Sequence, residues 1–227
     1  MKASTLLMAG AATMLFLGSC KKSSSDGASV GSTMQFQLKV ANPLVTLNRL
    51  SSPGTILWIS GSAATTEEKL EAKKDSSELE FKSTVLQQIN LFAPVTANMG
   101  NIVIPVGTYT EVEFKITLNQ NGSNPAMELN GQYTDAAGVI TPVTFSLNSL
   151  FELKAEQTNI TVAANTSITA LTTLDLSFVS SGITQAMLNS AAISSGKILI
   201  SVSSNSNLYN IIINNLQEFH HVDVSLH

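Results

Sequence analysis

The chain has 227 residues, of which 44% are hydrophobic and only 12% are charged, and its formal net charge is −4. This length suits one domain, or two small ones, with a sizeable buried core. The acidic balance and the single arginine, Arg49, argue against nucleic-acid binding, which needs clustered lysine and arginine. Because Cys20 is the only cysteine, no disulfide can form within the chain, and packing alone must stabilise the fold.

The first twenty residues are typical of a bacterial lipoprotein signal. Lys2 supplies a positive charge, and residues 6–17 form an apolar segment shorter than the roughly 20 residues of a membrane-spanning helix. The stretch Leu17–Cys20 resembles a lipobox, in which small residues precede a cysteine that receives a diacylglycerol and becomes the mature N-terminus. We therefore expect a signal peptide over residues 1–19 and a membrane anchor at Cys20, since two or more acyl chains give stable anchoring.

A polar, serine-rich segment follows the cysteine. Residues 20–32 show no apolar periodicity, which predicts a flexible tether. Lys21 stands directly after Cys20, where lipoproteins that stay in the inner membrane carry an aspartate. By this resemblance we expect an anchor in the outer membrane, with the folded part on its periplasmic face or at the cell surface.

Beyond the tether, alternating apolar and polar residues with frequent turn residues predict a mostly β fold. Residues 33–179 are expected to form an antiparallel β-sandwich of the transthyretin or immunoglobulin type. The clearest strand is residues 109–119, in which one face carries Val112, Phe114, Ile116 and Leu118. Further strands are expected over residues 34–40, 55–60, 78–85, 86–92, 127–133, 143–155, 159–163 and 167–179.

The markedly charged segment Thr65–Glu80 interrupts this pattern. It is compatible with an exposed helix or with a solvated hairpin at the edge of a sheet. Lysine and glutamate on an edge strand discourage pairing with other chains. In either case a solvated face is the simplest interpretation of such a charge run.

The last quarter of the chain carries the helical signal. Residues 180–227 are expected to form an extension, packed on the sandwich, with a strand over residues 197–203 and one or two short helices. A helical turn is expected over Thr184–Asn189. A longer helix is expected behind an Asn207 cap, with apolar residues at helical spacing: Leu208, Ile211, Ile212, Leu216 and Phe219.

A family resemblance enters at the turn Pro105-Val106-Gly107-Thr108-Tyr109, which precedes the long strand. Gly107 permits a tight turn, and Tyr109 can bury its ring while its hydroxyl caps the backbone at the sheet end. With residues 158–178, this stretch resembles bacterial lipoprotein domains of unknown function that have a transthyretin-like or prealbumin-like β-sandwich. The likeness spans roughly Met34 to Val179. It implies that fold, and because the family has no agreed activity, it supplies no catalytic residues.

The residues that could carry catalysis are few. His220, His221 and His227 all lie in the last eight positions, and no Gly-x-Ser-x-Gly motif is present. His220, His221 and Asp223 could bind a metal, but adjacent histidines on a strand point to opposite faces. We therefore expect no enzyme activity, no cofactor and no metal site, and a polar tail at the C-terminus. A hydrolase that uses these histidines is the enzyme alternative.

The leading functional hypothesis is a binding or scaffolding module of the cell envelope, anchored to the membrane through Cys20. Its partner would be an envelope protein or a glycan, and not a nucleic acid. A second hypothesis is a pilin-like assembly subunit processed near Arg49, because fimbrillin-type pilins lose an N-terminal strand by cleavage after an arginine. A third is a carbohydrate-binding lipoprotein that stacks sugars on Trp58 with tyrosines. Trp58 lies in an apolar strand, however, and we expect it in the core.

The tyrosines available for such a stacking platform are Tyr109, Tyr133 and Tyr209. An exposed Trp58 beside one of them would favour the third hypothesis.

Overall fold

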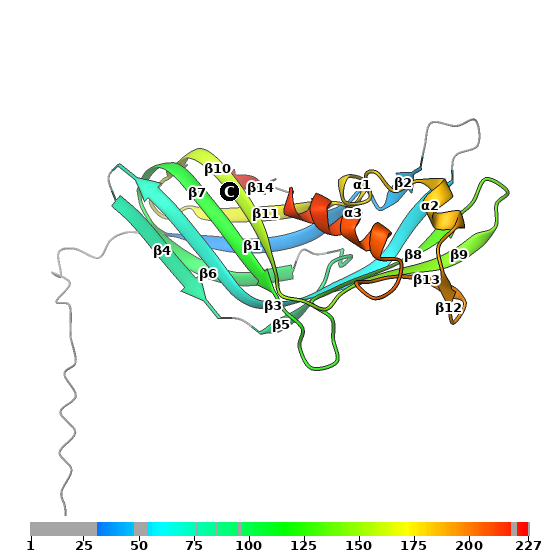
Figure 1. The fold of residues 1–227 in the computed structure, drawn as a ribbon. Coiled ribbons are helices and arrows are strands. Elements are labelled where there is room, and N and C mark those ends of the chain that lie inside the picture. Colours follow the sequence, from blue (N-terminus) through cyan, green and yellow to red (C-terminus); the bar gives the residue numbers. More distant parts are fainter. Residues whose placement is uncertain are drawn as a thin grey trace, which may run out of the picture.

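The structure is a computed structural model that describes residues 31–47, 54–75, 77–84, 86–94, 97–218 and 222–226. It is mostly β, and the short helices of the described part all follow residue 175 (Figure 1). This confirms the predicted β-sandwich with short helices near the C-terminal end. The strands are β1 (Gly31–Ala41), β2 (Leu44–Thr46), β3 (Thr55–Lys74), β4 (Ser77–Ser83), β5 (Gln87–Asn90), β6 (Ala97–Pro105), β7 (Gly107–Leu118), β8 (Met127–Thr134), β9 (Ile140–Leu147), β10 (Phe151–Val162), β11 (Ser167–Asp175), β12 (Ile193–Ser194), β13 (Lys197–Ile200) and β14 (Val222–Leu226). The helices are α1 (Leu176–Val179), α2 (Gln185–Asn189) and α3 (Ser206–Gln217).

The larger sheet is built around β3, which is 20 residues long and extends through both halves of the molecule (Figure 1). One edge of β3 pairs first with β8 and then, beyond a bulge between Thr65 and Glu67, with β7. Ala64 marks the junction, because it hydrogen-bonds both Ala126 and Asn119, at the facing ends of β8 and β7. The other edge of β3 pairs in turn with β2, β5 and β4. β9 and β10 extend the sheet beyond β8 and β7.

The smaller sheet, in the order β14-β11-β1-β6, covers the half of the large sheet that contains β7 and β10. The two layers meet in the core, where the rings of Phe36 on β1 and Phe114 on β7 pack edge to face with centroids 5.4 Å apart. β1 pairs on both edges, with β6 antiparallel and with β11 parallel. The β1–β11 and β9–β13 pairs are parallel, whereas the other pairs of the described strands are antiparallel.

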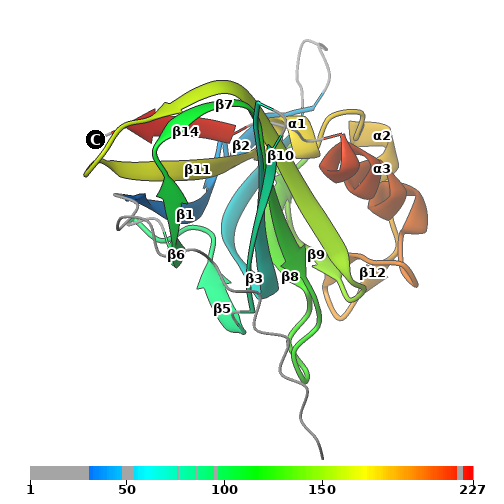
Figure 2. The same ribbon diagram turned by 90° about the vertical axis from the view of Figure 1, so that its left-hand side faces the viewer.

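The helices cover the other half of the large sheet, beside β8 and β9 (Figure 2). Tyr209 on α3 stacks on Phe145 of β9 with ring centroids 5.9 Å apart. Tyr133 on β8 donates its hydroxyl to Asn189 Oδ1 at 2.6 Å. The segment after residue 180 therefore completes the core under β8 and β9, while the small sheet completes it under β7 and β10.

The charged segment Thr65–Glu80 forms a hairpin at the sheet edge and contains no helix. Residues up to Lys74 continue β3, and β4 returns antiparallel along its edge. The helical alternative is therefore wrong and the edge hairpin is confirmed. Leu79 and Phe81 on β4 are partly buried and pack against the core.

Several boundaries differ from the sequence-based expectations: the strand expected over residues 55–60 continues to Lys74, the one expected over 159–163 is the end of β10, the one expected over 197–203 ends at Ile200, and β6 was not expected. β1 begins at Gly31, inside the expected tether. The strand expected over residues 143–155 is two strands, interrupted at residues 148–150. The strand expected over residues 167–179 ends at Asp175, whose carboxylate accepts hydrogen bonds from the N–H groups of Ser177 and Phe178 and caps α1. An aspartate in this position favours a helix start over continuation of the strand.

A further difference is at α3, whose cap is Asn205 rather than Asn207. Asn205 has left-handed backbone geometry, with φ of 51°, and its side chain makes no capping hydrogen bond. The amide instead donates to the carbonyls of Leu199 and Ala192, at 2.8 and 3.0 Å. The side chain that could have capped the helix is thus used to hold the β12–β13 hairpin.

Candidate functional site

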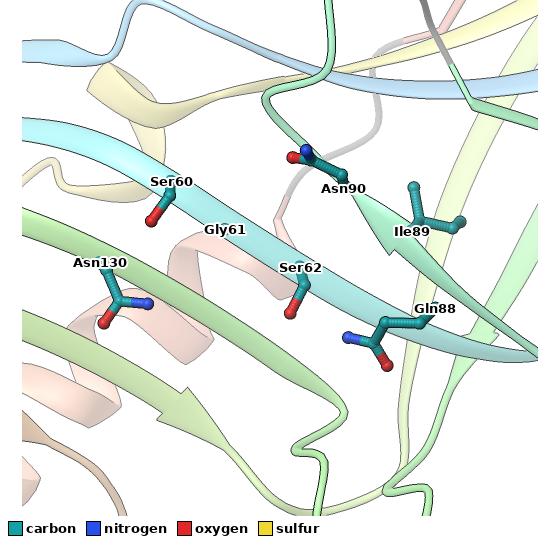
Figure 3. A pocket seen from close by; sticks show the side chains of 7 residues that line it. All are labelled: Ser60, Gly61, Ser62, Gln88, Ile89, Asn90 and Asn130. Atoms are coloured by element: carbon teal, nitrogen blue, oxygen red, sulfur yellow. The ribbon is translucent and has the colours of Figure 1, made fainter.

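A polar hollow of about 330 Å³ lies on the outer face of the large sheet, at the middle of β3 between β5 and β8 (Figure 3). This face is turned away from the buried residues that contact the helices and the small sheet. The hollow is lined by Ser60, Gly61, Ser62, Gln88, Ile89, Asn90 and Asn130.

The strand register brings these side chains together. Ser60 lies opposite Asn130 on β8, and Ser62 lies opposite Asn90 on β5. Directly opposed residues of an antiparallel pair point to the same face of the sheet. A β-bulge between Trp58 and Ser60 puts these two residues on opposite faces, although their spacing in a regular strand would put them on one. Trp58 therefore enters the core while Ser60 faces solvent.

Gly61 lies at the floor of the hollow because β3 and β8 approach closely there. A Cβ atom at this position would lie 2.7 Å from Leu129 Cδ2 and 2.8 Å from the carbonyl oxygen of Glu128. Contacts this short do not occur in folded proteins, so a larger residue would force the two strands apart. Glycine inside a strand often marks such an approach.

Two asparagines of the lining are held in fixed orientations. Asn130 donates its amide to Glu128 Oε1 at 2.8 Å, and its carbonyl accepts a hydrogen bond from the Thr144 hydroxyl at 2.9 Å. Asn90 accepts a hydrogen bond from the N–H of Phe92 at 3.0 Å. Because each side-chain amide has two N–H donors, both residues keep donors that a ligand could use.

The other polar side chains of the hollow differ from the two asparagines in their hydrogen bonding. Within the described part of the chain, the side chains of Ser60, Ser62 and Gln88 make no hydrogen bond to protein, and all three point to the same side of β3 (Figure 3). Hydroxyls and amides both donate and accept hydrogen bonds. The hollow thus presents neutral groups of both kinds and no charged side chain in its lining.

This chemistry suits binding and offers no reactive pair. The carboxylate of Glu128, which lies opposite Ser62 on β8, already accepts a hydrogen bond from Asn130. The lining contains no histidine, lysine or cysteine. Among the residues that the structure describes, no group of three or more His, Cys, Asp and Glu side chains could hold a metal ion.

The proposed aromatic platform is not formed. Trp58, Tyr109, Tyr133 and Tyr209 are all buried, the most exposed of them, Tyr209, at 8%. Trp58 donates its indole N–H to the hydroxyl of Ser180 inside the core, as expected for a core tryptophan. The prediction of sugar stacking on these rings is therefore wrong, because each ring fills space between the layers.

The Pro105–Tyr109 turn has the geometry that its residues predict. The Tyr109 ring is fully buried, and its hydroxyl donates to the carbonyl of Pro105 at 2.7 Å. Gly107 has φ of +154°, in a region that side chains disfavour. Burial raises the pKa of the Tyr109 hydroxyl. The turn carries the chain from the small sheet to the large one, so its role here is structural.

Several residues singled out in the sequence lie outside the described part of the chain. They are Cys20, Arg49, His220, His221 and His227. Asp223 belongs to β14, which pairs with β11. The lipid anchor at Cys20 therefore stays a prediction, processing near Arg49 stays an alternative, and the expectation that the histidines bind no metal stays untested.

Sequence reasoning did not find the hollow. Its residues belong to three strands and form no motif, and their proximity depends on the pairing of β3 with β5 and β8. The one local signal is Gly61 within the apolar strand pattern, which indicates a bulge or a close approach. Both are present here, but that signal does not identify Gln88 or Asn130 as neighbours.

No helix in the described part of the chain is both long enough and apolar enough to cross a bilayer. Comparison with known proteins gives no relative: no family model, no curated protein and no solved structure matches the chain.

Proposed function

We propose that this chain is a binding module of the bacterial outer membrane, anchored through a lipid on Cys20 and without catalytic activity. The polar hollow on the large sheet supports the binding role. It is lined by the hydroxyl and amide groups of Ser60, Ser62 and Gln88, which form no hydrogen bond within the described part of the chain, and by the amide of Asn130, which hydrogen bonds hold in place. The lipobox at Leu17–Cys20 supports the anchor.

The ligand that best fits the hollow is a neutral, hydroxyl-rich molecule such as an envelope glycan. Sugar hydroxyls donate and accept hydrogen bonds, as do the serine and amide groups of the lining. An extended peptide would need a free strand edge, but at Ser62 both edges of β3 are paired, with β5 and β8. The volume of about 330 Å³ lies at the small end of the range for ligand pockets.

The binding role is tested with an array of uncharged oligosaccharides, followed by calorimetry on those that bind. Ser62→Ala with Gln88→Ala should weaken binding at least about tenfold, because each lost hydrogen bond contributes about 1 kcal/mol. Gln132→Ala is the matched control, since Gln132 is exposed on the neighbouring β8 but does not line the hollow. No oligosaccharide bound, or equal loss in the control, contradicts this site.

The anchor is tested separately. Cys20→Ser should move the protein from the membrane fraction to the soluble fraction, because the thiol that carries the lipid is replaced. Mass spectrometry of the wild-type protein should show acyl chains on Cys20. Persistent membrane association of the variant contradicts the anchor without affecting the glycan hypothesis.

A pilin-like assembly subunit is the second candidate, and the place of β1 favours it. β1 lies between β11 and β6 and buries Met34, Phe36 and Leu38. Cleavage after Arg49 would separate β1 and β2 from the rest of the chain, and the loss of β1 would open a groove that a strand of another subunit could fill. This candidate predicts a stable polymer after treatment with a trypsin-type protease. A protein that stays monomeric and uncleaved at Arg49 excludes it.

A further inference from the structure

The half of the large sheet that carries β4, β7 and β10 has a charged outer face, although the chain as a whole is poor in charge. The strand register sorts these charges into two adjacent rows that cross the strands in the order β4, β3, β7, β10. The lysine row consists of Lys82, Lys69, Lys115 and Lys154. The glutamate row consists of Glu80, Glu71, Glu113 and Glu156.

Like charges in directly opposed positions are unfavourable within a sheet. Contacts between the two rows offset this cost, including Lys115 to Glu71 at 2.7 Å and Lys69 to Glu80 at 3.3 Å. The rows are open to solvent at their ends, where the side chains of Lys82 and Glu80 are 52% and 56% exposed, whereas the inner side chains are 14% to 24% exposed. If lysine and glutamate instead alternated from strand to strand within a row, ion pairs could form without like charges in directly opposed positions.

On each of the four strands, a lysine lies on one side of the line between the two rows and a glutamate lies on the other side. On β3 the outward residues are Glu67, Lys69, Glu71 and Lys73, so their signs alternate. A two-fold axis parallel to the rows, lying between them and above the sheet, would place each row over the opposite row of a second copy. Lys69 would then face Glu71 of the second copy, and Glu71 would face its Lys69.

We propose that two copies of this chain associate through this charged face, related by that two-fold axis. Such an interface is isologous, and a single surface must therefore complement itself. The lysine and glutamate rows meet this requirement on every one of the four strands. The residues of the two rows do not line the polar hollow at the middle of β3, so this association does not rest on the glycan site.

The positions that flank the two rows also fit. Glu67 would face Lys73 of the second copy, which adds a favourable pair. Glu111 on β7 would face Thr117, and Glu152 on β10 would face Thr158, so that neither meets a like charge. The flanking rows therefore add one favourable pair, and the contacts named here include no like charges.

The face predicts a weak, salt-sensitive dimer. Four strands about 4.8 Å apart and four rows about 6.8 Å apart span on the order of 500 Å² per copy, which is typical of transient contacts. Exposed ion pairs contribute little each and are screened by salt. A shared lipid anchor would confine copies to one surface and raise their effective concentration.

Sedimentation equilibrium of the full chain tests the dimer, with Cys20→Ser in every sample so that acyl chains do not contribute. Self-association is expected at about 0.01 M NaCl and should be lost at about 1 M, where the Debye length falls from about 30 to about 3 Å. Lys69→Glu with Lys115→Glu should weaken it at least about tenfold, and so should Glu71→Lys with Glu113→Lys.

Mixing the two charge-reversed variants provides the decisive measurement. Their faces are complementary to each other, so an equimolar mixture should associate within about threefold of wild type while each alone does not. Lys39→Glu with Lys197→Glu is the control, since it makes the same change in net charge outside the face. Thermal unfolding shows whether each variant is folded. If either double variant is unfolded, the variant that exchanges all four charges replaces it in the test, and it should dimerise. A wild-type monomer at low salt, or a mixture that stays monomeric, overturns the proposal.

Discussion

Trp58 and Ser180, 122 residues apart in sequence, form a buried hydrogen bond of 3.1 Å between the indole N–H and the serine hydroxyl. Each residue is 1% exposed. The bond joins β3 to the end of α1 and so fixes the C-terminal segment on the half of the large sheet that the small sheet leaves uncovered. Buried polar groups in such contacts must be paired, because an unpaired one costs about 1 to 3 kcal/mol.

Replacing Trp58 with phenylalanine should destabilise the fold by about 2 to 4 kcal/mol, since it removes the donor, leaves Ser180 unpaired and creates a cavity. Urea unfolding measures the change. Ser180→Ala, alone and combined with Trp58→Phe, completes a double-mutant cycle that isolates the hydrogen bond. If the two changes are simply additive, the bond does not couple the sheet to the C-terminal segment.

Much of the fold could be predicted because a sandwich strand has one buried face and therefore alternates. Residues 111–118 follow this rule, and their inward residues Val112, Phe114, Ile116 and Leu118 are buried as expected. The pattern is less clear in the C-terminal half of β3. Glu68 takes an inward position there with Leu70 and Ala72, so apolar and polar residues do not alternate although burial does. The parallel pairing of β1 with β11 could not be predicted either, because it joins segments over 130 residues apart and leaves no local signature in the sequence.

The candidate site was less predictable than the fold. Ser60 faces solvent because a bulge follows Trp58, and a bulge of one residue cannot be located from alternation alone. Gln88 and Asn130 meet Ser62 only through the register of two further strands. The lysine and glutamate rows have the same origin, since their members are scattered between residues 69 and 156.

Removing the hydroxyl of Tyr109 should weaken the turn between the two sheets. Tyr109→Phe loses the 2.7 Å hydrogen bond to the carbonyl of Pro105 and should destabilise the protein by about 1 to 2 kcal/mol in urea unfolding. Tyr209→Phe is the control, because the Tyr209 ring packs on Phe145 while its hydroxyl bonds no described residue. Equal losses in the two variants would show that the Pro105 contact has no special role.

Glu68 should make the protein less stable as the pH rises through neutrality. Its side chain is buried, neither carboxylate oxygen has a hydrogen-bond partner in the described part of the chain, and burial raises its pKa to about 7. The unfolded chain releases this proton near pH 4.5, so the folded state binds more protons between about pH 4.5 and 7 and loses stability over that range.

Glu68→Gln should remove this dependence. The variant should gain about 1 to 3 kcal/mol over wild type at pH 8 and differ little at pH 4, as measured by urea unfolding at both values. Glu68→Met tests the same point without an amide to bury. A wild-type stability that is flat between pH 5 and 8 would show that Glu68 is solvated or paired in the folded protein.

Glu71 should make the protein less stable as the pH falls into the acid range. Hydrogen bonds from Lys115 and then Lys69 lower its pKa to about 2, from an ordinary value of 4.5. The ionised form is thus favoured in the folded state, and its contribution is fully present above pH 4.5 and lost as the pH falls toward 2. Solvent screens these pairs, because the Glu71 side chain is 20% exposed.

Glu71→Gln should therefore destabilise the protein by about 1 kcal/mol at pH 7, and the difference from wild type should vanish near pH 2. Urea unfolding at low salt measures both points, and high salt should reduce the difference at pH 7 because it screens the pairs. Glu78→Gln is the matched control, since Glu78 lies on the same outer face of the sheet and forms no ion pair within 4.0 Å with a residue that the structure describes. A Glu71 variant as stable as the Glu78 variant at pH 7 would show that the charged rows contribute nothing to the stability of the single chain.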